Sequence, residues 1–161
     1  MIKNILTILV IFLFLNSCTS ISGKQAEAAM STANEAEAGK VEYLTYETFI
    51  EKVWDFEANP QEWVYKGNVP SIIDFYADWC APCRKIAPIM DKLAKDYEGQ
   101  LKVYKIDVDV ERKLAGVFQV RSIPAVMFTP LNGQPMMQAG ALSEDMYIKI
   151  VEEQLIAESS K

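Results

Sequence analysis

The sequence of 161 residues contains no histidine and only three cysteines. Without histidine, a Ser-His-Asp triad, a Cys-His dyad and a histidine metal site are excluded within this chain. The cysteines are Cys18, Cys80 and Cys83. A structural zinc site takes four ligands, and no second pair of ligands accompanies Cys80 and Cys83, so we expect no metal site. The cysteine thiols are therefore the first candidates for chemistry.

Positive charge is also scarce, because 16 lysines and arginines accompany 22 aspartates and glutamates, which gives a formal net charge of −6. Without a basic cluster, the chain is a poor partner for nucleic acid or anionic lipid headgroups. We expect no nucleic-acid binding and interpret the acidic balance as an aid to solubility. The length and a hydrophobic content of 50% suit one compact domain with tails.

No apolar run is long enough to span a bilayer, which takes about 20 residues. The run at residues 5–15, with Lys3 before it, has the length and flank of a signal-peptide core. It ends in Leu15-Asn16-Ser17-Cys18, which resembles the lipobox of bacterial lipoproteins, in which the cysteine is lipidated. We therefore expect residues 1–18 to be a lipoprotein-type signal peptide. The alternative is cleavage after Ala26-Glu27-Ala28, which would release a soluble periplasmic protein.

Residues 19–40 are predicted to be a flexible tether, because they are rich in Ala, Ser and Glu, lack aromatic residues and cannot bury a core. Residues 41–161 are predicted to form one α/β domain. Strands are expected at residues 41–44, 69–77, 101–108, 125–129 and 134–138. Helices are expected at residues 46–57, 84–97 and 111–118, and a last helix is expected after Ser143. The residues of the last helix that should face the protein core are Met146, Ile150, Val151 and Leu155.

The alternation of strands and helices predicts a mixed, mostly parallel five-stranded sheet with helices on both faces. The turn Leu131-Asn132-Gly133 between two strand-like runs adds an antiparallel hairpin at its edge.

Cys80 and Cys83 are three residues apart at the junction between a predicted strand and a predicted helix. At a helix N-terminus, unpaired N–H groups and the positive end of the dipole favour the thiolate of Cys80. Cys83 lies one turn further on the same face, where it can resolve a mixed disulfide. A static disulfide is the alternative, but closing so short a loop constrains the unfolded chain very little. The pattern therefore predicts a redox-active dithiol.

Asp74 lies in the middle of an apolar strand, six residues before Cys80. Burying an unpaired carboxylate is costly, and burial raises its pKa. Such a group can exchange a proton with Cys83. The alternative, an exposed strand end, is disfavoured by the apolar neighbours of Asp74. We therefore predict a catalytic role for this carboxylate.

From about Val41 to Leu155 the chain resembles thioredoxins in several separate segments that agree in order and spacing. The segments are Asp74-Phe75-Tyr76-Ala77-Asp78-Trp79-Cys80-Ala81-Pro82-Cys83, Ile86-Ala87-Pro88, Val103-Tyr104-Lys105-Ile106-Asp107-Val108-Asp109, Val120-Arg121-Ser122-Ile123-Pro124-Ala125 and Gly140-Ala141-Leu142-Ser143. The resemblance implies a thioredoxin fold and dithiol–disulfide exchange with protein substrates, in which Cys80 attacks and Cys83 releases the product. It implies no bound cofactor, because the thiols hold the electrons, and it implies a separate membrane or periplasmic electron donor.

The resemblance also suggests roles for residues beyond the cysteines. Lys105 matches the lysine that tunes the buried carboxylate of Asp74, although a solvated strand lysine is the alternative. In the family the peptide bond before Pro124 is cis and turns the backbone of Ile123 toward the substrate. Trp79 is expected to flank the substrate, with simple packing as the alternative. The remaining expected substrate contacts are Ala81, Pro82 and Gly140.

The sequence departs from the family pattern at several positions. Ala81 and Ser122 stand where glycine is common, and Tyr76 stands where tryptophan is common. The loop at residues 58–68 is longer than the family minimum and contains two aromatic residues. These aromatics either form a lip for a particular partner or pack on the first helix.

Together these features predict a monomeric protein-disulfide reductase outside the cytoplasm, anchored to a membrane by lipid on Cys18. A net oxidase or isomerase with the same cysteine pair is the nearest alternative. The chain resembles reducing thioredoxins more than dedicated oxidases, which often have histidine between the cysteines. A copper metallochaperone and a non-catalytic binding module are more distant alternatives. The absence of histidine weighs against copper, whereas the pair Met136-Met137 keeps it open.

Overall fold

The computed structural model of the protein describes residues 39–157. The predicted signal peptide, the predicted lipidation site Cys18 and all but the last two residues of the predicted tether lie outside the described residues. The domain boundaries proposed for residues 1–40 therefore stay predictions. In the part that the structure describes, no helix combines the length and apolarity that a membrane span requires.

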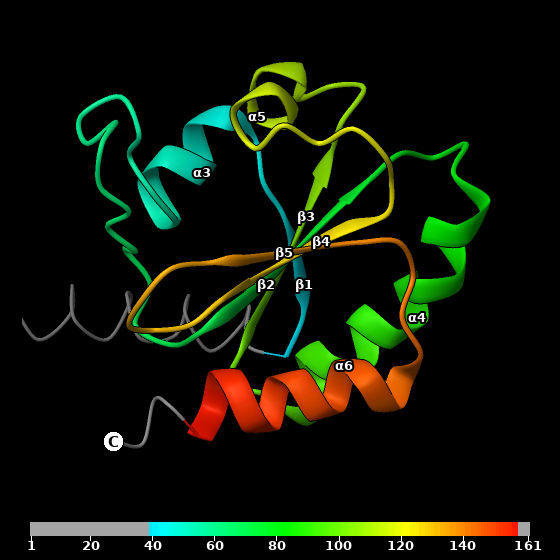
Figure 1. Cartoon of the computed structure of the whole chain (residues 1–161). Helices are drawn as coiled ribbons and strands as arrows, with labels where there is room; N and C mark the ends of the chain where they lie inside the picture. Colours follow the sequence, from blue (N-terminus) through cyan, green and yellow to red (C-terminus); the bar gives the residue numbers. More distant parts are fainter. Residues whose placement is uncertain (1–38, 158–161) are drawn as a thin grey trace, which may run out of the picture. The chain divides into compact units, whose positions relative to one another are not determined.

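Five strands form one mixed sheet, as the sequence predicts, and the structure places them in the order β1-β3-β2-β4-β5 (Figure 1). The strands are β1 (Val41–Tyr43), β2 (Ser71–Tyr76), β3 (Lys102–Asp107), β4 (Ala125–Thr129) and β5 (Met136–Ala139). β3 lies between β1 and β2 and is parallel to both. β4 is antiparallel to β2 and to β5, so the antiparallel part extends from the predicted edge hairpin into the centre of the sheet.

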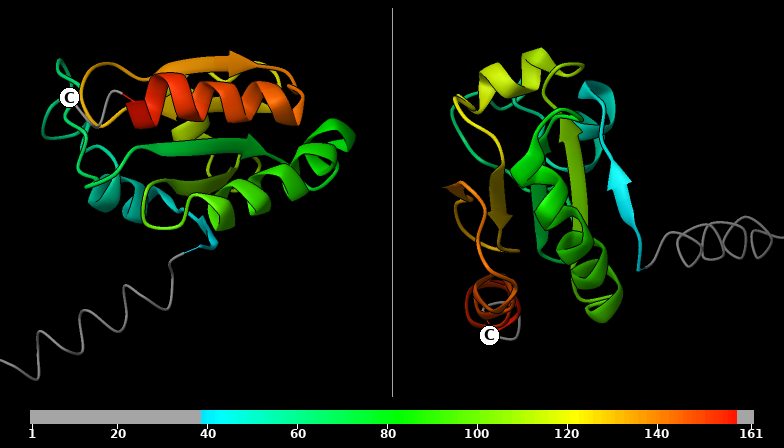
Figure 2. Two further views of the ribbon diagram at one scale, coloured as in Figure 1. Left: turned by 90° about the horizontal axis from the view of Figure 1, so that it is seen from below. Right: turned by 90° about the vertical axis from the view of Figure 1, so that its right-hand side faces the viewer.

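The helices cover both faces of this sheet. The helices are α3 (Tyr46–Lys52), α4 (Ala81–Asp96), α5 (Arg112–Val117) and α6 (Glu144–Ile150), which continues into the π-helical segment η2 (Val151–Ile156). Figures 1 and 2 show α3 and α5 on one face and α4 and α6 on the other. The start of α3 follows from its sequence, because Thr45 and Thr48 each accept a hydrogen bond from the backbone N–H of the other.

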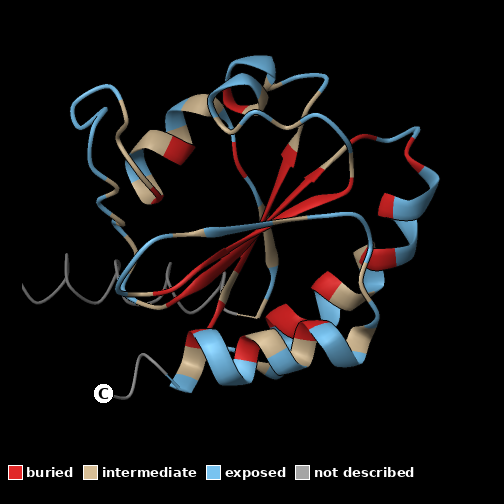
Figure 3. Ribbon diagram, in the orientation of Figure 1, coloured by how far each residue is buried: buried red, intermediate tan, exposed pale blue. Residues whose placement is uncertain are grey.

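Side chains of the central strands alternate between two apolar cores, one on each face. The core beneath α4 and α6 contains Ile72, Val103, Val126 and Phe128 from the sheet, with Met90, Leu93, Tyr147 and Leu155 from the helices. The core beneath α3 and α5 contains Ile73, Phe75, Ile106, Met127, Phe49 and Leu114. Figure 3 shows the strands largely buried and the outer helix surfaces exposed. Each fully buried side chain of this size contributes about 1.5–3 kcal/mol, so these two cores hold the sheet and helices in place.

Two local predictions are wrong. α3 ends at Lys52, not near Glu57, and the chain then turns so that the indole N–H of Trp54 donates to the carbonyl of Glu62 at 2.9 Å. In α6 the side chain of Met146 is 46% exposed, and Tyr147 is buried instead. Tyr147, Val151 and Leu155 are spaced by four residues and share the inner face, from which Met146 is displaced by about 100°.

The long loop after α3 places its aromatic residues against the core beneath α3. The rings of Trp54 and Trp63 lie 4.9 Å apart, and those of Trp63 and Tyr65 are stacked at 6.5 Å. All three rings border the core beneath α3 and α5. This arrangement agrees with the packing interpretation of the loop.

Candidate active site

The two cysteines lie at the start of α4, where the sequence places them. Cys80 is the N-cap of this helix, and its Sγ accepts a hydrogen bond from the backbone N–H of Cys83 at 3.2 Å. A disulfide joins the two residues, whose Cα atoms are 5.3 Å apart. Pro82 fits the first turn of α4, because the N–H group that proline lacks would have no intrahelical partner at that position. The helix thus aims its unpaired backbone donors at the sulfur of Cys80.

The residues expected to contact substrate surround the disulfide. Trp79 is 68% exposed, and its indole N–H donates to the carboxylate of Asp109 at 2.7 Å, so it is tethered at the surface and not packed in the core. Ala81 and Pro82 are exposed beside it. The tethered ring of Trp79 therefore borders the disulfide at the end of the loop that precedes α4.

The loop before β4 borders the disulfide with Ile123 and Pro124. The Ile123-Pro124 peptide bond is cis. The side chain of Ile123 packs against the small buried cluster that Ala77, Cys80 and Cys83 form, while Pro124 is buried. Gly140 is exposed, has a φ of +85° that favours glycine, and donates its N–H to the carbonyl of Pro124 at 2.8 Å. The structure thus joins three segments that are far apart in the sequence.

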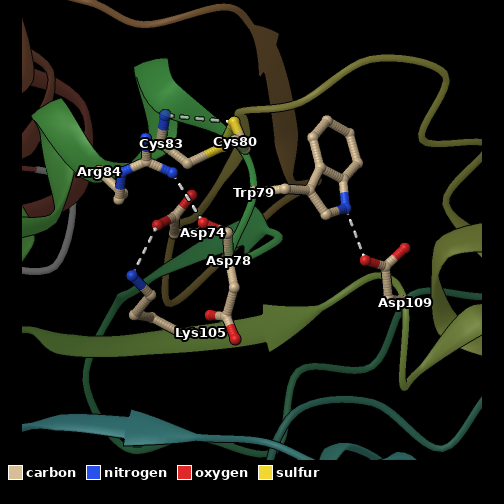
Figure 4. Close-up of a disulfide and its surroundings, with 8 residues drawn as sticks. All are labelled: Asp74, Asp78, Trp79, Cys80, Cys83, Arg84, Lys105 and Asp109. Carbon is tan, nitrogen blue, oxygen red and sulfur yellow. Dashed lines mark hydrogen bonds and ion pairs between the residues drawn. A yellow bond between two sulfur atoms is a disulfide. The ribbon is translucent and has the colours of Figure 1, made fainter.

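Asp74 and Lys105 form a buried ion pair under the disulfide. They are register partners on β2 and β3, and the ammonium of Lys105 lies 3.4 Å from Oδ2 of Asp74. The geometry is that of an ion pair rather than a hydrogen bond, and within the described residues nothing donates to either carboxylate oxygen. Lys105 is 7% exposed, so the alternative of a solvated strand lysine is wrong. Figure 4 shows the carboxylate of Asp74 between Lys105 and the disulfide.

Burial raises the pKa of Asp74 to about 6 from the usual 3.8, and the nearby ammonium of Lys105 opposes this rise. The side chain is fully buried, which makes its ionised form costly. A carboxyl group that titrates near neutral pH can both accept and release a proton under physiological conditions.

A surface cleft of about 190 Å³ connects this region with solvent. Its lining includes Cys83 and Lys105, with Tyr43, Tyr76 and Arg84 around them. The guanidinium of Arg84 donates to the backbone carbonyl of Asp78 at 2.8 Å, at one border of this cleft. The cleft therefore gives solvent access to Cys83 and Lys105, and Trp79 does not line it.

Sequence reasoning missed two aromatic residues next to the ion pair. The ammonium of Lys105 lies over the ring of Tyr76 at 4.2 Å from the centroid, and Tyr43 lies edge-on to that ring at 6.2 Å. The sequence contains no signal for these contacts until the strand order is known, because Tyr76 is 29 positions from Lys105 and 33 positions from Tyr43. In the described part of the chain, no cluster of three or more cysteine and acidic side chains suited to a metal ion is found.

Comparisons with known proteins identify relatives of this chain. The thioredoxin family model matches residues 51–153. Thioredoxin from Borreliella burgdorferi is 42% identical over 110 residues, which cover 68% of this chain and 93% of that protein. Thioredoxin 1 from Nostoc sp. is 36% identical over 92 residues, which cover 57% of this chain and 86% of that protein.

Among solved structures, the crystal structure of chloroplastic thioredoxin z matches with a TM-score of 0.58 and 25% sequence identity. The match covers 71% of this chain and 93% of that one. Its agreement confirms the predicted fold around the cysteine pair. The chain therefore belongs to the thioredoxin family and is a thioredoxin-like redox protein of the thiol–disulfide oxidoreductase type, with Cys80 and Cys83 as its cysteine pair.

Proposed function

We propose that this protein reduces disulfides in protein substrates outside the cytoplasm. The observation that supports this most is the position of the Cys80 sulfur at the N-terminus of α4, where the N–H of Cys83 donates to it. In the reduced protein the same donor and the helix dipole stabilise a thiolate on Cys80. The adjoining exposed residues Trp79, Ala81 and Pro82 leave a surface on which a substrate disulfide can approach.

The reaction begins with the dithiol form. The thiolate of Cys80 attacks one sulfur of the substrate disulfide, forms a mixed disulfide and releases the other substrate sulfur as a thiolate. Cys83 then loses its proton to the carboxylate of Asp74 and attacks the sulfur of Cys80. This step releases the second substrate thiolate and leaves the Cys80–Cys83 disulfide, so two electrons pass to the substrate.

Asp74 and Lys105 serve the second step. With a pKa of about 6, Asp74 is largely ionised at neutral pH and can take the proton of Cys83. The ammonium of Lys105, at 3.4 Å, stabilises the ionised carboxylate and so limits the rise in the pKa of Asp74 that burial causes. The proton leaves through the cleft that borders Cys83 and Lys105.

On this proposal, protein substrates bind beside Trp79, and the backbone of Ile123 faces them next to the cis bond. The two sulfurs hold the electron pair, so the reaction uses no bound cofactor. A separate membrane or periplasmic donor restores the dithiol after each turnover, and the protein acts as a monomer. A net oxidase would use the same residues to transfer electrons in the opposite direction. An isomerase would use them with no net transfer of electrons.

The reductase function is tested by insulin reduction with dithiothreitol as the source of electrons. We expect catalytic amounts of the protein to accelerate precipitation of the insulin B chain well above the rate with dithiothreitol alone. A rate equal to that of the reagent alone would contradict the proposed function.

We further propose that lipid on Cys18 anchors the protein to a membrane, on the basis of the apolar run and lipobox-like sequence before it. In bacterial cells, the wild-type chain should then partition into the detergent phase of a Triton X-114 extraction. Cys18→Ala should instead give an unprocessed precursor or a soluble form. If the wild-type chain is wholly in the soluble periplasmic fraction, the lipid anchor is wrong, and soluble secretion is the better account.

A further inference from the structure

Three chemically distinct residues form a row across the sheet beneath the cysteines. In the strand register Tyr43 of β1 pairs with Lys105 of β3, and Lys105 pairs with Asp74 of β2. Paired residues of neighbouring strands project to the same face of a sheet. The buried ion pair therefore has Tyr43 as its neighbour on the outer side, at the edge of the sheet.

The ring of Tyr76 contacts both Tyr43 at the edge of the sheet and Lys105 of the ion pair. It follows Asp74 by two residues on β2 and so lies on the same face. The ammonium of Lys105 lies 4.2 Å from the centre of its ring, and the ring of Tyr43 meets it edge-on at 6.2 Å and 71°. Both contacts are of favourable kinds, a cation over the face of a ring and an edge-to-face pair of rings.

Two clefts reach Lys105 from solvent, and Tyr43 borders both of them. One has a volume of about 190 Å³ and contains Cys83 in its lining. The other, of about 250 Å³, extends toward Val110 and Glu111. Tyr43 is 65% exposed and Lys105 is 7% exposed, so Tyr43 is the solvent-facing member and Lys105 the inner member of a lining that both clefts share. Loss of the Tyr43 ring should therefore widen the access of water to Lys105.

We propose that Tyr43 is a positioning residue of the redox site, which holds the ring of Tyr76 and covers Lys105 so that the ammonium stays on Asp74. The role in catalysis rests on the proposed reductase function, because it acts on the carboxylate that receives the proton of Cys83. The positioning itself concerns only the resting structure and is measured without any substrate.

The physical reason is the strong hydration of an ammonium group on a flexible stem. When water reaches Lys105 on the side of Tyr43, the ammonium gains hydration by turning outward and leaves the carboxylate of Asp74. That carboxylate stays buried beneath α4, and without the nearby positive charge its ionised form is less stable. Loss of the Tyr43 ring should therefore raise the pKa of Asp74.

Other charged or titratable groups surround the pair, and the substitution at Tyr43 leaves the chemistry of each of them unchanged. They come from every element that borders it and comprise Tyr76, Asp78, Cys83, Arg84, Asp107, Glu111 and Tyr147. In the disulfide form Cys83 does not titrate, so this form isolates the response of Asp74.

The experiment is a carbon-13 NMR titration of the Asp74 carboxyl group in the oxidised full chain. Tyr43→Ser should move the midpoint upward by roughly one pH unit, a part of the effect expected for a lost opposite charge. Tyr43→Phe keeps the ring and should titrate like the wild type. Lys105→Met should raise the midpoint by at least as much, and Tyr43→Ser should add no further rise in a chain that already carries Lys105→Met.

The double variant decides whether Tyr43 acts through Lys105. An equal upward shift from Tyr43→Ser with and without Lys105 would overturn the proposal, as would an unchanged or lowered midpoint in Tyr43→Ser alone. A lowered midpoint would mean that water stabilises the carboxylate more than the lost ammonium destabilises it. Because the titration uses no substrate, its outcome is independent of whether the protein reduces insulin.

Discussion

Cys80→Ser should abolish insulin-disulfide reduction, because serine provides no thiolate to attack the substrate. The hydroxyl of serine can still cap α4, so the fold around the site should persist. We expect the rate to fall to that of dithiothreitol alone, measured by precipitation of the insulin B chain. An unchanged far-ultraviolet circular dichroism spectrum is the control for folding.

Cys83→Ser should have a different outcome, since it leaves the attacking thiolate and removes the resolving one. Substrates should accumulate as mixed disulfides on Cys80, which non-reducing gels and mass spectrometry detect. Recovery of trapped partners on Cys80→Ser, with none on Cys83→Ser, would reverse the assignment of the two cysteines. The pair therefore forms its own matched control, because each variant keeps one thiol in the same helix.

Asp74→Asn should slow the release of the mixed disulfide and leave the first attack by Cys80 unchanged. General base catalysis of this kind contributes about 10²–10⁴-fold, and we expect about 10²-fold or less because a thiol is already fairly acidic. Stopped-flow exchange with a disulfide substrate separates the two steps. Resolution at the wild-type rate and with the wild-type pH profile would leave Asp74 without a role in proton transfer.

The same variant should remove a pH dependence of stability. The pKa of Asp74 is about 6 in the folded protein and near 3.8 in the unfolded chain, so the folded state binds the proton more tightly. Stability from this group is therefore fully present below about pH 4 and is lost as pH rises through 6. The contribution of Asp74 to the free energy of unfolding should fall by about 3 kcal/mol over this window. The other titrating groups are shared by both chains, so urea unfolding at pH 4 and pH 8 should show the stability difference between the wild type and Asp74→Asn changing by about this amount.

Some parts of the site follow from local sequence alone. The apolar run around Asp74 predicts a buried strand, and a carboxylate within it is conspicuous because burial penalises its charge. The spacing of Cys80 and Cys83 next to a helical pattern predicts their place at the start of α4. These features depend on neighbours in the chain, which is why periodicity suffices to find them.

Other parts depend on contacts between distant segments. The pairing of Asp74 with Lys105 requires the register of two strands, and only the resemblance to thioredoxins suggested it beforehand. The sequence does not indicate Tyr43 as part of the site, because its contact with Tyr76 exists only when β1 joins the edge of the sheet next to β3. The prediction for the inner face of α6 is wrong by one residue in helical phase, because Tyr147 and not Met146 faces the core.

The equilibrium reduction potential of the Cys80–Cys83 pair decides in which direction electrons flow between this protein and its substrates. The protein is equilibrated with defined mixtures of reduced and oxidised glutathione, the thiols are trapped, and the two forms are quantified by mass spectrometry. We predict a strongly reducing potential, in the range of about −270 mV known for thioredoxin. A value close to about −120 mV, which is typical of a strong disulfide oxidant, would contradict the reductase assignment.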